Sequence, residues 1–87
     1  LQEGIVVVDN AGYITMLNKA YGEFLAVDPH AVVGKQVADV IPNSRMHLVA
    51  QEGKAEVTDI QKIQNNTCVV SRIPIIKDGE IIGAVGN

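Results

Sequence analysis

The dipeptide Asp78-Gly79, set between two runs of apolar residues, restricts the fold more than any other feature of the sequence. Asp-Gly favours the two-residue turns that join antiparallel strands into a hairpin. The flanking runs predict strands over residues 67–76 and 80–86. Asn65-Asn66 is a second predicted turn just before them, because asparagine tolerates positive φ. The last third of the chain is therefore predicted to be an antiparallel meander.

A further hairpin is predicted over residues 4–17, near the start of the chain. The β-branched run Ile5–Val8 is followed by the turn formers Asp9-Asn10-Ala11-Gly12 and then by a second strand-like run. The first strand of the meander, at 56–63, is ambiguous. Its apolar residues lie three apart, a spacing that would also suit a helix.

Short helices are predicted between the two hairpins, with boundaries set by capping residues, proline and glycine. The predicted pieces are 18–26 with Asn18 as N-cap, a turn from Asp28-Pro29 to Gly34, 37–41 before Pro42, and a helix capped by Asn43 or Ser44 and closed by Gly53. Every other connection is short, so the predicted class is α+β. We expect one domain over residues 1–87, a five-stranded antiparallel sheet with short helices on one face.

The predicted strand 67–76 is apolar on both faces. One face carries Cys68, Val70, Arg72, Pro74 and Ile76, and the other carries Thr67, Val69, Ser71, Ile73 and Ile75. A sheet with one face in water would alternate more cleanly. We therefore expect a homodimer, formed through the outer sheet face or through flanking helices.

Composition excludes several classes of function. The chain has 7 Lys and Arg against 10 Asp and Glu and no basic cluster, so we expect no direct nucleic-acid binding. No apolar run approaches the roughly 20 residues of a membrane span. The single cysteine, Cys68, is typical of an intracellular protein and excludes an internal disulfide. The start at Leu1 and the end at Gly86-Asn87, directly after a strand-like run, indicate a piece of a longer protein with its last strand truncated. The compartment expected from the single cysteine is the cytoplasm.

Three segments together resemble a PAS domain. GIVVVDNAGYITMLNKAYGEFL resembles its opening hairpin and first helix, VVGKQVADVIP its G-K-x-x-x-x-x-P segment, and VVSRIPIIKDGEIIGAVG its closing hairpin. The resemblance implies a sensory or dimerisation domain that passes a ligand or partner signal to an output domain and is not an enzyme.

PNSRMHLVAQEGK further resembles the PAS domains of sigma-54-dependent bacterial transcriptional regulators. A regulator of that kind, sensing a small molecule or a partner, is the main expectation. The alternatives are a PAS module of a sensor histidine kinase and a ligand-free dimerisation scaffold.

The cofactors that PAS domains bind give three tests. The light-sensing flavin branch carries an N-C-R-F-L-Q motif, which is absent here, and Cys68 falls on a predicted strand. Haem-binding relatives use a histidine on the helix that corresponds to the one carrying His47 in this sequence. At about 100° per residue, however, His47 points away from the face shared by Met46, Val49 and Ala50. Two histidines without ligand spacing predict no metal site. We therefore expect no flavin of that type, no haem through His47 and no other cofactor.

Arg72 is the most informative polar residue, because a guanidinium in a central apolar strand needs a partner. Two interpretations stay open. It could bind a carboxylate or phosphate ligand, or it could form a salt bridge with Asp59, Glu80 or Glu56. No acid–base pair or nucleophile suggests catalysis. The predicted pocket wall consists of Met46, Val49, Ala50, Cys68, Val70 and Arg72.

Overall fold

The computed structural model describes residues 3–87, with the backbone alone at Thr58. Its elements are β1 (Val6–Asp9), β2 (Ile14–Leu17), α1 (Lys19–Leu25), α2 (Val37–Val40), α3 (Met46–Glu52), β3 (Glu56–Ile63), β4 (Asn66–Lys77) and β5 (Glu80–Gly86). The strands form one antiparallel sheet in the order β2-β1-β5-β4-β3. The predicted α+β class is confirmed, while Leu1 and Gln2 of the predicted domain lie outside the described residues.

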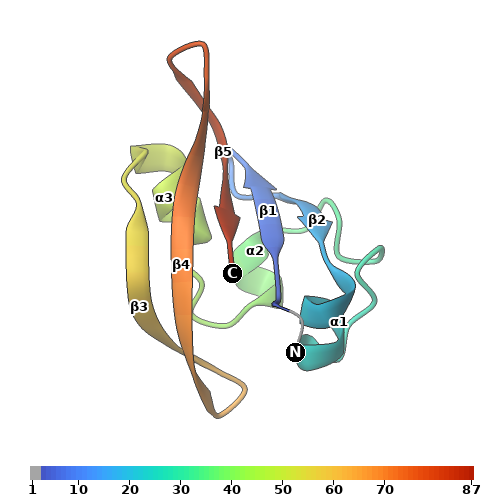
Figure 1. The fold of residues 1–87 in the computed structure, drawn as a ribbon. Helices are drawn as coiled ribbons and strands as arrows, with labels where there is room; N and C mark the ends of the chain where they lie inside the picture. The colour runs from blue at the N-terminus through green and yellow to red at the C-terminus, as the bar shows by residue number, and fades with distance from the viewer. Residues whose placement is uncertain (1–2) are drawn as a thin grey trace.

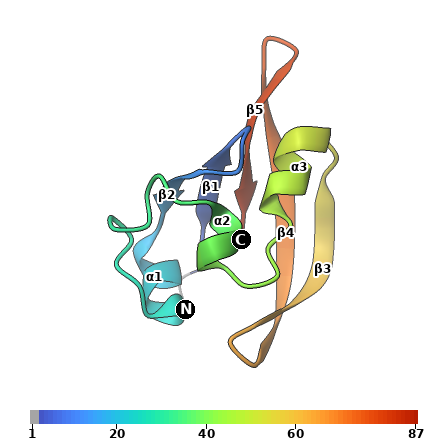
Figure 2. The same ribbon diagram turned by 180° about the vertical axis from the view of Figure 1, so that it is seen from behind.

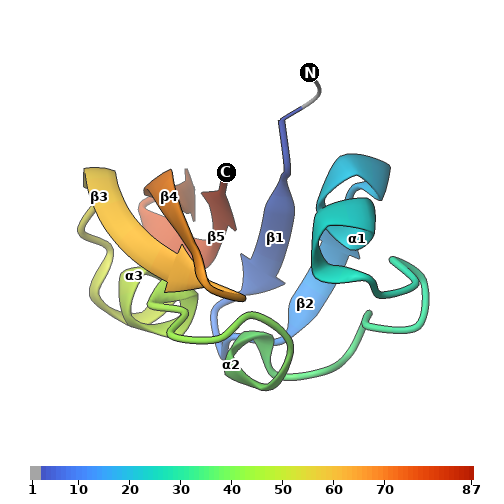
Figure 3. The ribbon, with the colours of Figure 1, turned by 90° about the horizontal axis from the view of Figure 1, so that it is seen from below.

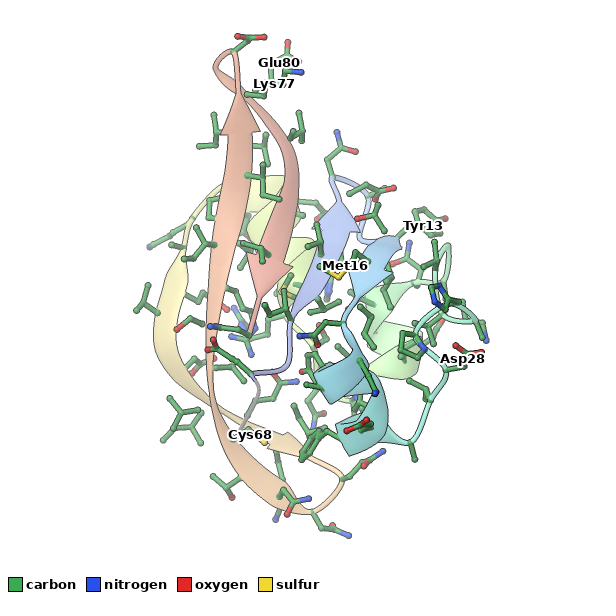
Figure 4. All side chains as sticks on the ribbon, turned by 45° about the vertical axis from the view of Figure 1, so that its right-hand side comes forward. Tyr13, Met16, Asp28, Cys68, Lys77 and Glu80 are labelled. Atoms are coloured by element: carbon green, nitrogen blue, oxygen red, sulfur yellow. The ribbon has the colours of Figure 1, made fainter. Side chains whose placement is uncertain are left out.

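Helices α2 and α3 lie on one face of the sheet, behind the strands in Figure 1 and in front of them in Figure 2. Seen from below, α1 lies beside β2, at the edge of the curved sheet (Figure 3). The β4–β5 hairpin projects beyond the rest of the molecule, with Lys77 and Glu80 at its tip (Figure 4). The opposite sheet face carries no helix of the described chain.

Helix α1 begins as the sequence predicts. Asn18 has an extended backbone, and its side chain accepts a hydrogen bond from the Tyr21 amide at 3.0 Å. Helix α3 begins differently, because Arg45 occupies the N-cap position without a side-chain cap. Ser44, one of the two predicted caps, lies one residue before this N-cap, and its hydroxyl oxygen accepts a hydrogen bond from the Met46 amide at 3.2 Å.

The pairing of strand β3 explains why its sequence pattern is ambiguous. Its pairing with β4 is irregular between Glu56 and Asp59. A bulge of this kind adds a residue to one strand and changes which side chains share a face. Val57 and Ile60 are therefore both exposed, at 66% and 71%, whereas Ile63 is buried in the core. The three-residue spacing comes from a bulged strand and not from a helix.

A second irregularity corrects one predicted side-chain position. Ile76 was expected to share a face with Arg72, but the pairing of β4 with β5 shifts between Ile75 and Ile76. Ile76 is 59% exposed. The alternation therefore holds only up to this shift.

The core lies between the helices and the inner sheet face. It is built almost entirely from aliphatic side chains, with Tyr21 as its one aromatic residue. Its buried members are Val6, Val8, Ile14, Leu17, Tyr21, Leu25, Val32, Val37, Ile41, Met46, Val49, Ala50, Ile63 and Ala84.

Candidate functional site

Helix α3 turns the predicted face toward the sheet. Met46, Val49 and Ala50 are buried, and the helix packs against β4, β5 and β1. The helical spacing of these residues is responsible, because positions three and four apart share one side. They form part of the interior wall.

The interior next to this wall is almost completely filled. Met46, Val70 and Arg72, together with Tyr21 and Gln61, line a cavity of about 10 Å³. A space of that size holds about one water molecule. Val49 and Ala50 pack without lining it, and Cys68 lies elsewhere. The six predicted wall residues are therefore not gathered around one ligand-sized pocket.

Arg72 is held by its own chain. Its Nη1 atom donates to Glu56 Oε1 at 3.0 Å and to Asp59 Oδ2 at 2.8 Å. Its Nη2 atom donates to Gln61 Oε1 at 2.6 Å. Only 3% of the side chain is exposed. Of the two interpretations left open, the structure contains the salt bridge, with partners from the neighbouring strand β3.

The Arg72 network also reaches the segments in front of α3. Arg45 donates to both carboxylate oxygens of Glu56, with Nη2 at 2.8 Å from Oε2. Gln61 donates to the carbonyl oxygen of Pro42 at 2.8 Å. Buried polar groups stabilise a unique arrangement when all of them are satisfied. These bonds tie the sheet to the chain on both sides of Ser44.

The guanidinium groups of the network lower the pKa of both carboxyl groups. The hydrogen bond from Arg45 lowers the pKa of Glu56, with Arg72 adding to the effect. The hydrogen bond from Arg72 lowers the pKa of Asp59. Burial raises the pKa of Tyr21, a residue that lines the same cavity. Glu56 and Asp59 are therefore held in their charged forms.

The stability of the domain should fall in acid because of these two carboxylates. Folding lowers the pKa of both carboxyl groups. The stability that they contribute is therefore complete above the pKa of an unfolded carboxyl group, and it is lost as the pH falls through the lower pKa of the folded state. We expect the free energy of unfolding, measured by urea titration, to decrease between roughly pH 5 and pH 2. Glu56→Gln should make this decrease shallower. An equally steep decrease in the variant would contradict the assignment.

His47 lies on the flank of α3, as its helical position predicts. It packs against the first hairpin: a Cβ atom placed on Gly12 would come within 2.9 Å of the His47 Cβ. Its Nδ1 atom is buried and has no hydrogen-bond partner among the described residues. His47 therefore packs against a turn through its Cβ, and it does not line the interior cavity.

A groove of about 200 Å³ runs between α1 and the β3–β4 hairpin. Tyr21 and Phe24 form one wall, and Ile63, Cys68 and Val70 form the other. Cys68 has a free thiol and lies toward the end of the sheet opposite to Lys77 and Glu80 (Figure 4). Residues 3–4 and Asn87 complete the rim. Both ends of the described chain therefore meet this groove.

The outer sheet face carries apolar side chains on all five strands. The register aligns Met16 with Val7, Val7 with Val85, and Val85 with Ile73. Met16 and Ile73 are 41% and 48% exposed. The neighbouring pair Val69 and Ile60 is still more exposed. These six residues are called the outer row below, and they match the apolar second face that the sequence predicts.

Sequence reasoning missed Gln61 and the chain ends. Gln61 is 7% exposed and joins Arg72 to Pro42, and it shares the inner face of β3 with the buried Ile63, two residues further along the strand. Glu3 and Asn87 are neighbours only because β1 and β5 pair in the sheet. A polar residue inside an apolar strand is the signal that could have indicated Gln61.

Two classes of site are not found in the described part of the chain. No group of three His, Cys, Asp or Glu side chains within residues 3–87 is placed to hold a metal ion. No helix of this part has the length and apolar character needed to cross a membrane.

A five-stranded antiparallel sheet with short helices, a closely packed interior and an apolar outer face defines a small α+β domain. The PAS fold family matches residues 1–87, the whole chain. This chain belongs to the PAS family, whose members are sensory modules and not catalytic domains.

Similar sequences come from larger bacterial sensor proteins. The chain is 33% identical to the sensor protein CitS of Halalkalibacterium halodurans, over all of its own length and 16% of that protein. It is 28% identical to a probable C4-dicarboxylate sensor kinase of Bacillus subtilis, over 98% of the chain and again 16% of the relative. The chain thus spans about a sixth of each of these relatives.

Solved structures support the fold. A domain of an HTR-like protein from Haloarcula marismortui has a TM-score of 0.74 and 21% identity, over 95% of this chain and 91% of that one. The PAS domain of Bordetella pertussis BvgS has a TM-score of 0.66 and 22% identity, over 99% of this chain and 73% of that one.

Proposed function

We propose that this domain is the PAS module of a sensor histidine kinase, and that it passes a signal through changes in packing to a kinase core elsewhere in a longer protein. The match of nearly the whole chain to a sensor protein and to sensor kinases carries this proposal. The names of these relatives favour the sensor-kinase alternative over the sigma-54-dependent regulator that the sequence suggested. The cytoplasm remains the proposed compartment, which is consistent with the single free thiol of Cys68.

The filled interior supports a relay that needs no ligand or cofactor bound in the core. A cavity of about 10 Å³ is too small for a dicarboxylate or any larger ligand. The guanidinium that could have bound an anion already pairs with Glu56, Asp59 and Gln61. We infer that this domain does not relay a signal by holding a small molecule in the core cavity beside Arg72.

The outer row supports self-association as the means of relay. Exposed apolar surface in a contiguous patch marks interaction sites on soluble proteins. Two copies meeting through this face would bury Met16, Ile73, Val69 and Ile60 together. A shift of the sheet would then change how the two copies meet, and hence how the segments leaving them are placed.

One pair of variants tests this proposal. Ile73→Glu places a charge in the outer row, whereas Val33→Glu places one at an equally exposed site outside the sheet, at 48% and 49% exposure respectively. We expect Ile73→Glu to raise the dimer dissociation constant by about tenfold or more, measured by sedimentation. Autophosphorylation of the longer protein should fall with it. The same loss in Val33→Glu, or a wild-type protein that neither dimerises nor phosphorylates itself, would refute the proposal.

A further inference from the structure

Asn18 binds the segment Glu3–Ile5, which leads into β1. Asn18 Oδ1 accepts from the Ile5 amide at 2.9 Å, and Asn18 Nδ2 donates to the Glu3 carbonyl oxygen at 2.8 Å. The Asn18 amide also donates to the Ile5 carbonyl oxygen at 2.9 Å. Asn18 is at the same time the N-cap of α1. The incoming segment is therefore bound to the start of a helix.

Asn87, directly after β5, holds the same segment from the other side. Its backbone exchanges two hydrogen bonds with Ser71, at 3.0 and 3.2 Å, which continue the pairing of β5 with β4. Its side-chain Nδ2 atom donates to the Glu3 carboxylate. The backbone of Glu3 is thus bound by Asn18, and its side chain by Asn87.

This segment packs on the core mainly through Gly4, whose backbone lies against the Tyr21 side chain. Glu3 is exposed, Gly4 and Ile5 are half-buried, and residues 3–4 lie over the rim of the groove between α1 and the β3–β4 hairpin. Segments with few buried apolar contacts open at low free energy. The hydrogen bonds of Asn18 and Asn87 therefore decide whether residues 3–5 stay docked.

We propose that Glu3, Asn18 and Asn87 form a clasp that couples the incoming segment to the end of β5. A displacement of residues 3–5 breaks the Glu3–Asn87 contact, and a displacement of Asn87 loosens residues 3–5 in turn, because the coupling of two sites is reciprocal. A signal arriving through the incoming segment would reach the end of β5 without passing through the core. This inference rests on the proposed relay function.

The clasp can be tested by exchanging its side chains. Asn87→Asp removes the donor and places two carboxylates opposite each other. The double variant Glu3→Gln with Asn87→Asp restores a donor and an acceptor in the reverse direction and keeps the wild-type net charge. Glu3→Gln alone still offers an amide oxygen to Asn87. The three variants therefore separate loss of the contact from loss of a charge.

Hydrogen exchange at the Ile5 amide of the 87-residue chain reports on the clasp directly. We expect Asn87→Asp to speed this exchange about fivefold, the double variant to return it to within twofold of wild type, and Glu3→Gln alone to change it little. The Gly53 amide, which donates to the Val49 carbonyl oxygen at the C-cap of α3, serves as the internal control and should not change. Unchanged exchange in Asn87→Asp, or no recovery in the double variant, would overturn the clasp.

The signalling role is measured separately, in the longer protein. Autophosphorylation should change in Asn87→Asp and recover in the double variant. Should exchange follow the prediction while autophosphorylation stays constant, the clasp would exist without carrying the signal, and its relay role would be refuted. A longer protein with no autophosphorylation at all would refute the proposed function and leave the exchange result standing.

Discussion

Arg72→Ala is expected to lower the free energy of unfolding by about 2–4 kcal/mol, measured by urea denaturation. The side chain is 3% exposed, so its removal leaves a cavity against Val70 and Tyr21. It also leaves the buried Gln61 oxygen without its donor. Both effects act in the same direction, because a void and an unsatisfied polar group each destabilise the folded state.

Two further variants divide this loss into its parts. Arg72→Met fills most of the space without the charge, so its stability should lie between those of wild type and alanine. Arg45→Ala removes the other guanidinium bound to Glu56, but Arg45 is exposed to solvent and should matter much less. An Arg72→Ala variant no less stable than Arg45→Ala would show that the buried network does not hold the sheet to the helices.

Gly83→Ala is expected to cost about 3 kcal/mol, because β5 approaches β1 too closely for a side chain at this position. A Cβ atom on Gly83 would lie 2.2 Å from the Val8 carbonyl oxygen and 3.4 Å from the Asp9 Cα. Both atoms belong to the backbone, so a side-chain rotation cannot relieve the contact. The two strands would have to separate where Asp9 pairs with Gly83.

A glycine in the turn provides the matched control for Gly83→Ala. Gly79 lies in the β4–β5 turn with φ of 79°, and a Cβ atom there would have no neighbour within 4 Å. Gly79→Ala should therefore cost only the strain of the left-handed region, about 1 kcal/mol. Equal losses in the two variants, measured by thermal and urea unfolding, would show that the close approach of β1 and β5 does not limit position 83.

The outer row shows how far alternation along a strand can predict the shape of a sheet. Val69 and Ile73 were placed on the second face of their strand by position alone, and both are exposed. The same alternation failed at Ile76, where the pairing shifts by a residue. Alternation describes an unbroken strand, and it says nothing of where a bulge interrupts the pairing.

The sequence predicted only part of the candidate site. The need of Arg72 for a partner followed from its type and its strand, and Glu56 and Asp59 were among the carboxylates considered. Their simultaneous contact depends on the bulge between them, which brings both oxygens to Nη1. The size of the neighbouring cavity depends on side chains from distant parts of the chain. Local spacing predicts neither.

The amino-acid sequence by itself determined the order of the elements, the α+β class, the turn at Asp78-Gly79 and the cap at Asn18, because each depends on residues close together in the chain. Only the tertiary structure decided which carboxylates bind Arg72, how little space the interior leaves, and that Glu3 meets Asn87. These contacts depend on strand order, register and bulges, which bring together residues as far apart as the two ends of the described chain.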